Sequence, residues 1–256
     1  MSAGPGGRIA GAPGRLASAP APELGDFTAT WRVIPMSLAA VTIGLLSACV
    51  ALALLRLIGL FTNLFFFQRW DFALVAPAGN RLGAVEVLVP AAGALVVGFM
   101  ARYGSERIRG HGIPEALESI LIRGSRVEPR VALLKPLSAA ISIGSGGPFG
   151  AEGPIIMTGG AFGSMVAQFL KLTSAERKTL LVAGAAGGMS ATFASPVAAV
   201  ALSVELLLFE WKPRSLVPVA LASATAAAAR RYLIGLGPLF PTPPHPLFIG
   251  PVGLLG

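Results

Sequence analysis

The sequence predicts an all-α membrane protein, a polytopic bundle of short, broken and tilted helices. The chain has 256 residues, of which 54% are hydrophobic and only 12% are charged, and its mean hydropathy is +0.73. That charged fraction is about half of what soluble domains carry. Its 32 glycines and 21 prolines interrupt most of the apolar runs. Short apolar runs broken in this way are typical of discontinuous membrane helices around a site at the midplane.

The excess of basic residues does not indicate nucleic-acid binding. The net charge is +8, but basic side chains such as Arg107 and Arg123 lie between apolar segments. Aromatic residues make up 7% of the chain and do not alternate with the charges, as a single-strand platform would need. Positive loops that flank membrane spans explain the charge better. Since no His, Cys, Asp and Glu cluster has metal-ligand spacing, we expect no metal and no cofactor.

Composition divides the chain into three parts. Residues 1–29 are rich in Ala, Gly, Pro and Ser without the apolar core of a secretory signal, so they predict a disordered N-terminal tail. Residues 30–236 predict one transmembrane domain. Residues 237–256 predict a proline-rich loop and then an apolar segment that stops in mid-pattern, as in a truncated chain.

The apolar segments predict the helices in order. The run Trp31–Phe67 is long enough to cross a bilayer, and Ala84–Tyr103 gives a second span. Pro114–Ile122 is apolar but too short to cross. Further segments separated by Gly and Pro clusters follow at Val131–Ile143, Ile155–Leu172, Leu180–Phe193, Pro196–Phe209 and Leu216–Ile234. Small residues in their interiors favour close helix packing.

The glycine-rich stretch Gly144–Pro154 places one carboxylate, that of Glu152, between two apolar runs. Glycine exposes backbone N–H groups, and proline suits the first turn of the helix that follows. Because a helix start offers free N–H groups and the positive end of its dipole, this stretch predicts an anion site. Its predicted lining is Gly150, Ala151, Gly153 and Pro154. Glu152 would compete with the ion as a gate, the alternative being a plain N-cap carboxylate.

A second motif of the same design precedes it by about forty positions. Its predicted anion-binding residues are Gly110, His111, Gly112, Ile113 and Pro114. Glu115 follows in the first turn, where it complements the helix dipole. His111 is a hydrogen-bond donor for an anion from either ring nitrogen, the alternative being a loop histidine at a membrane interface.

No catalytic residue is predicted. Ser145 lies between two glycines, but a serine nucleophile needs a histidine base, and His111 and His245 lie in a turn and a proline-rich tail. The run Gly184–Gly188 follows no strand, which argues against a nucleotide loop. We therefore expect no enzyme. Glu205 lies within an apolar segment, where it is either a structural partner for a basic group or part of a proton path.

Three motifs resemble the CLC family of chloride channels and chloride/proton antiporters. Gly110–Pro114 is similar to its Gly-Ser-Gly-Ile-Pro signature and Gly150–Pro154 to its Gly-(Lys/Arg)-Glu-Gly-Pro signature. The stretch Gly184–Glu205, with Phe193–Pro196, resembles the next helix pair. The resemblance covers roughly Trp31–Ile234. It implies the first of two inverted repeats, in a homodimer in the bilayer of the cell membrane, with one path per subunit for chloride or a related anion.

The departures from the family pattern shape the expected function. His111 stands where the family has a coordinating serine, and Ala151 where it has a basic residue. Proton-coupled members carry an internal glutamate directly after the residue that matches Glu205, and here that position is Leu206. The resemblance therefore favours channel-like conduction gated by Glu152, or a different proton route in an antiporter.

The family's second-half motifs, Gly-x-Phe-x-Pro and a site tyrosine, do not occur in the sequence. The chain is thus expected to be an N-terminal half that forms no complete path alone. A non-conducting membrane scaffold or assembly fragment is the alternative.

Overall fold

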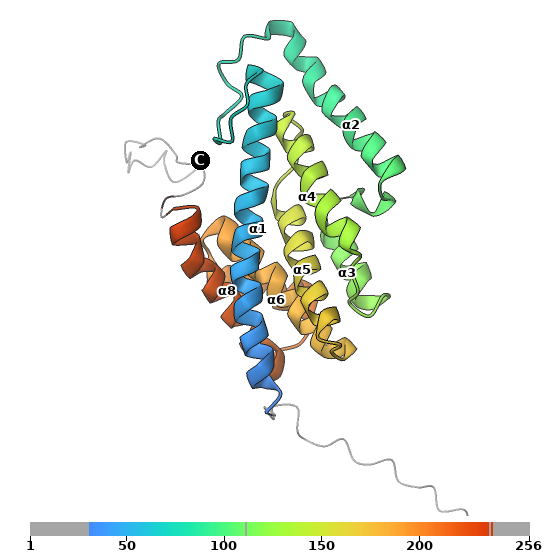
Figure 1. Cartoon of the computed structure of the whole chain (residues 1–256), viewed down its shortest axis with the longest axis vertical. Helices are drawn as coiled ribbons and strands as arrows, with labels where there is room; N and C mark the ends of the chain where they lie inside the picture. The colour runs from blue at the N-terminus through green and yellow to red at the C-terminus, as the bar shows by residue number, and fades with distance from the viewer. Residues whose placement is uncertain (1–30, 111, 236, 238–256) are drawn as a thin grey trace, which may run out of the picture.

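A computed structural model describes residues 31–110, 112–235 and 237, and this part of the chain is helical and contains no strand (Figure 1). The all-α prediction is therefore confirmed. The predicted tail and most of the proline-rich loop lie outside the described residues, so the domain boundaries stay a prediction. In chain order the elements are α1 (Val33–Phe67), η1 (Gly83–Leu88), α2 (Val89–Tyr103), η2 (Glu106–Ile108), α3 (Ile113–Leu121), α4 (Pro129–Gly144), α5 (Glu152–Phe169), α6 (Ser174–Phe193), α7 (Pro196–Ser203), η3 (Val204–Leu208) and α8 (Pro213–Leu233).

Only two helical stretches among the described residues are long and apolar enough to cross a bilayer on their own. They are Val33–Phe67, and Gly83–Tyr103, which joins η1 to α2. By contrast, α3 has nine residues and α7 has eight. The structure thus has the short, broken helices that the sequence predicts.

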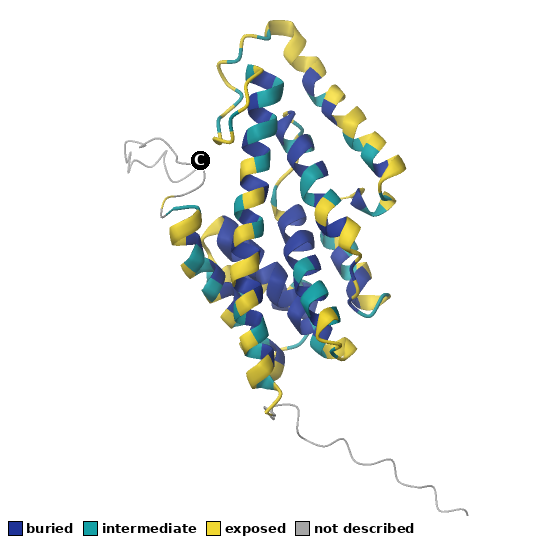
Figure 2. Cartoon of the chain, in the orientation of Figure 1, coloured by how far each residue is buried: buried dark blue, intermediate teal, exposed yellow. Residues whose placement is uncertain are grey.

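The core lies where α5, α6, α8 and α1 pack together (Figure 2). Figure 2 shows α5 and α6 largely buried, whereas α2 is mostly exposed and buries only Val89, Gly93 and Ala101. The deeply buried helices are rich in small residues. This fits helices that associate through close backbone packing rather than through large side chains.

Glycines bring α5 and α6 into backbone contact. A methyl group added at Gly184 would stand 2.8 Å from the carbonyl carbon of Gly159, and one at Gly163 would stand 2.9 Å from that of Leu180. Both separations are too short for a real side chain, so these positions hold the helix axes close together. This crossing fixes α5, and with it the helix start that carries Glu152.

Candidate anion-binding site

The two glycine motifs meet in space. Gly112, directly before α3, has φ +100°, a backbone conformation that glycine adopts without strain. A Cβ atom added there would stand 2.6 Å from the carbonyl carbon of Gly153 and 3.2 Å from its Cα atom. The starts of α3 and α5, about forty positions apart in the sequence, therefore lie backbone against backbone.

The first motif is closed by its own carboxylate. The backbone N–H of Gly112 donates to Oε2 of Glu115 at 2.7 Å, and the same carboxylate lies over Gly110. Gly110 has φ +88° and Pro114 occupies the first turn of α3. Ile113 begins the helix and lines the same cavity as Glu152. His111 lies outside the described residues, so its predicted role stays untested.

A buried lysine holds the first motif in place. Lys135 of α4 is 2% exposed, and its Nζ atom donates to the carbonyl oxygens of Ile108 at 3.0 Å and Gly110 at 2.8 Å. The lysine thus fixes the backbone that leads into α3 and brings a positive charge beside it. Sequence reasoning missed this residue. The available signal was a single lysine within the otherwise apolar run Val131–Ile143.

The second motif presents an unpaired carboxylate. Glu152 is the first residue of α5 and is exposed, and within the described part of the chain it makes no hydrogen bond and no ion pair. Its side chain folds back over Gly150, where an added Cβ would overlap Oε2. Gly153 and Pro154 are buried behind it, and Ala151 is half-buried. Its carboxylate therefore does not act as the N-cap of α5, whose cap position is Ala151.

The segment that carries Glu152 borders two cavities. One, of about 300 Å³, is lined by Gly110 and Gly150 from the two motifs and by polar side chains of α4. Those groups are Lys135, Ser138 and Ser142. The other, of about 390 Å³, is mostly apolar and lies against Glu152 itself. It is lined by Ile113, Ile156, Met189, Phe193, Ser195, Ala198, Ala199 and Leu202.

The remaining predicted residues lie apart from this point. Glu205 is exposed in the π-helical turn η3, does not line the cavity at Glu152 and makes no ion pair among the described residues. Ser145 is buried and its hydroxyl donates to the carbonyl of Ser142 at 3.0 Å. The run Gly184–Gly188 is an internal part of α6.

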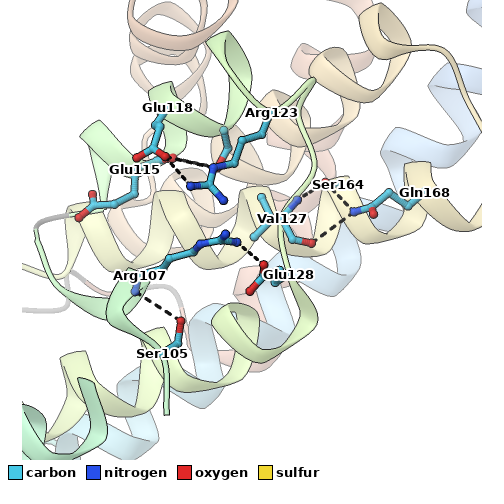
Figure 3. Close-up of polar contacts among 10 residues, drawn as sticks. Ser105, Arg107, Glu115, Glu118, Arg123, Val127, Glu128, Ser164 and Gln168 are labelled. Carbon is cyan, nitrogen blue, oxygen red and sulfur yellow. Dashed lines mark hydrogen bonds and ion pairs between the residues drawn. The ribbon is translucent and has the colours of Figure 1, made fainter. Parts of the chain in front are cut away.

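Ion pairs tie the surroundings of the first motif together (Figure 3). Arg107 pairs with Glu128, and Nη2 of Arg123 lies 2.7 Å from Oε1 of Glu118. The segment between α3 and α4 is also tied to α5, because the N–H of Val127 donates to Oγ of Ser164 at 3.2 Å and Nε2 of Gln168 donates to the carbonyl of Val127 at 3.3 Å. These contacts fix the direction of α3 relative to α5.

Short helices whose starts converge on one point are typical of membrane transport proteins. Residues 92–256 match the family described as voltage gated chloride channel. The chain belongs to this family, which confirms the resemblance that its motifs indicate, and it is accordingly an integral membrane protein.

Individual relatives agree with the family. The chain is 31% identical to the voltage-gated ClC-type chloride channel ClcB of Yersinia pseudotuberculosis over 173 residues, or 66% of this chain and 41% of that protein. It is 37% identical to the H⁺/Cl⁻ exchange transporter ClcA of Citrobacter koseri over 144 residues, or 54% of this chain and 28% of that one.

A solved structure shares the fold. It is the crystal structure of a slow cyanobacterial Cl⁻/H⁺ antiporter, which matches with a TM-score of 0.63 and 22% identity, over 79% of this chain and 48% of that one. The chain thus spans less than half the length of the relatives it matches.

Proposed function

We propose that this chain forms one wall of a path for chloride or a related small anion, and that Glu152 gates the path. The observation that carries the proposal is the contact of Gly112 with Gly153, which places the starts of α3 and α5 side by side. Two helix starts bring positive dipole ends to one point, and those N–H groups that are not bonded to Glu115 stay free there. The charge of Lys135 offsets that of the Glu115 carboxylate beside the first motif. The proposed anion-binding residues are Gly110, His111, Gly112, Ile113, Pro114, Gly150, Ala151, Gly153 and Pro154.

Glu152 suits the role of a gate for three reasons. It is tethered at the helix start, it is unpaired among the described residues, and it lies over Gly150. A carboxylate in that place repels an approaching anion and competes with it for the same N–H groups. When it is protonated or swings away, the competition ends. The gate therefore opens through the state of one side chain rather than through movement of whole helices.

Family membership suggests the membrane location and the oligomeric state of the protein. We propose that two copies of the complete protein form a homodimer in the cell membrane, with one anion path in each subunit. The large apolar side chains exposed on α1 and α2 suit contact with lipid, and examples are Leu38, Leu95 and Phe99. Nucleic acid has no part in this function.

The test is a chloride efflux assay in proteoliposomes. This chain, extended by the C-terminal part of the Yersinia relative, is compared with the same protein carrying Glu152→Gln. We expect faster and less pH-dependent efflux from the variant, because the amide has no charge to repel the anion. Glu86→Gln is the matched control, since Glu86 is exposed in η1 and does not line either cavity at the site. Equal rates for the parent and Glu152→Gln would overturn the gating role and favour a scaffold.

Proton-coupled exchange is the second candidate, and one observation favours it. The Citrobacter relative, which is 37% identical over the matched residues, is named an H⁺/Cl⁻ exchange transporter. Leu206 cannot carry a proton, so exchange would need another route, for which Glu205 is the candidate. A proton electrode in the same assay separates the two candidates. Proton movement coupled to chloride and lost in Glu205→Gln supports exchange, and its absence supports a channel.

A further inference from the structure

A cavity of about 320 Å³ lies between α1, the segment after α1 and the end of α8, away from the site described above. Two arginines line it, Arg56 of α1 and Arg230 of α8, and among the described residues no acidic one does. The remaining wall is largely apolar. It consists of Leu52, Leu55, Phe72, Ala73, Leu74, Leu233, Ile234 and Gly237.

Arg230 is a buried cation without a carboxylate partner in the described part of the chain. It is 4% exposed, and its Nη1 and Nη2 atoms donate to the carbonyl oxygens of Gly235 at 2.7 Å and Gly237 at 2.8 Å. Its Nε atom is buried and has no hydrogen-bond partner. Carbonyl oxygens do not neutralise a guanidinium, so its positive charge remains for an anion.

Arg56 is a second cation in need of an anion. It is exposed on the apolar helix α1 and, among the residues that the structure describes, it makes no hydrogen bond and no ion pair. The wall opposite is held in place by Asn63, whose Nδ2 atom donates to the carbonyls of Asp71 at 3.1 Å and Ala73 at 2.9 Å. The Asp71 carboxylate is engaged elsewhere, 3.9 Å from Nη2 of Arg69. Arginine inside a membrane helix is costly unless an anion or water meets it.

The cavity lies at the depth of a membrane surface. At the start of α1, Arg32 pairs with Glu176 at 3.3 Å, which marks one charged layer. From Arg32 to Arg56, 24 positions at 1.5 Å each span about 36 Å, which for a tilted helix matches a hydrocarbon core of about 30 Å. Figure 1 shows α8 running alongside α1, and the end of α8 and Arg56 line the same cavity. Arg56 therefore lies about one bilayer thickness from that charged layer, and α1 continues beyond it to Phe67.

We propose that this cavity binds the phosphate headgroup of an acidic phospholipid. The guanidinium groups supply charge-assisted hydrogen bonds to the phosphate, and the leucine and phenylalanine side chains receive the upper part of an acyl chain. A free phosphate would satisfy the arginines but would leave the apolar wall uncovered. The proposal does not depend on whether the protein conducts chloride.

The test measures lipid retention on the purified chain in neutral detergent by native mass spectrometry. Phosphatidylglycerol is compared with phosphatidylcholine of the same acyl chains, and wild type with Arg56→Gln. We expect retention of phosphatidylglycerol over phosphatidylcholine by wild type, and an affinity for phosphatidylglycerol about fivefold lower in Arg56→Gln. Arg231→Gln is the matched control, because Arg231 lies exposed in the last turn of α8 and does not line the cavity.

Two outcomes would overturn the proposal. The first is equal retention of phosphatidylglycerol by wild type and Arg56→Gln, or an equal loss in Arg231→Gln. The second is displacement of phosphatidylglycerol by millimolar inorganic phosphate, which would make the ligand a free anion. Arg56→Lys keeps the charge and serves as a folding control, with an expected affinity between those of wild type and Arg56→Gln.

Discussion

The carboxylate of Glu152 occupies the space that a side chain at position 150 would need. Because only the flexible end of Glu152 stands in the way and Gly150 does not have a positive φ, Gly150→Ala leaves the fold intact and pushes the carboxylate aside. In the efflux assay we expect a chloride rate at least about threefold higher, approaching that of Glu152→Gln. Gly98→Ala is the control, since nothing lies within 4 Å of a Cβ atom there. An unchanged rate would mean that the carboxylate at this place does not limit passage.

Lys135 carries the second prediction at this scale. Lys135→Met keeps an unbranched side chain as far as the ε position but removes both hydrogen bonds to the carbonyls of Ile108 and Gly110. We expect a loss of about 3 kcal/mol or more in stability, since two bonds from a charged donor are lost, each contributing about 1.5–3 kcal/mol. The thermal midpoint in detergent measures the loss. Exposed Lys171→Met is the control, and equal midpoints for the two variants would contradict the anchoring role.

At this scale the sequence predicts the carboxylates better than their partners. Glu152 stands out because a charge between apolar runs is rare, and Glu115 because it follows a glycine-opened start. The same reasoning passed over Lys135, since a lysine in a helix usually reaches solvent. Its burial follows from the two carbonyls that it meets, and these come from a segment some twenty-five positions earlier. Pairing over that distance leaves no local pattern.

At the scale of the element, the crossing of α5 and α6 gives the sharpest prediction. A Cβ atom at Gly163 would stand 2.9 Å from the carbonyl carbon of Leu180, where backbone cannot yield without moving a helix. We expect Gly163→Ala to lower stability by about 2 kcal/mol or more. Gly98→Ala is the matched change in an open helical position, where alanine adds up to about 1 kcal/mol through helix propensity. Thermal unfolding in detergent compares the two, and equal midpoints would show that the helices can separate without loss.

Helix positions follow from apolar runs, whereas helix starts follow from polar contacts. The apolar segment Leu180–Phe193 locates α6, but the helix begins at Ser174. Thr173 and Glu176 cap it, with the N–H of Thr173 donating to Oε2 of Glu176 at 3.0 Å. The apolar pattern misses this first turn because its residues are largely polar. The predicted segment Pro196–Phe209 likewise divides into α7 and the π-helical turn η3, a difference in hydrogen bonding that apolar composition cannot distinguish.

At the scale of the whole molecule, the sequence predicts the two motifs but not the contact between them. Two glycine-opened starts of one design indicated a shared path, but their contact depends on how α3 lies against α5. The crossing of α5 with α6 and the ties of Val127 to Ser164 and Gln168 set that arrangement. These are contacts between distant segments, so the motifs predict the chemistry of the site while the packing decides its geometry.

The cavity at Glu152 is open on one side, which leads to a prediction for the 256-residue chain when it is reconstituted by itself. Apolar side chains border it and remain exposed, including Phe193 at 43% and Leu202 at 40%. A bilayer against this face supplies no polar group for an ion, and hydrocarbon does not dissolve chloride. We therefore expect proteoliposomes of the 256-residue chain to lose chloride no faster than empty liposomes. Chloride-selective efflux from the chain alone that changes with Glu152→Gln would mean that copies of this chain complete the path by themselves.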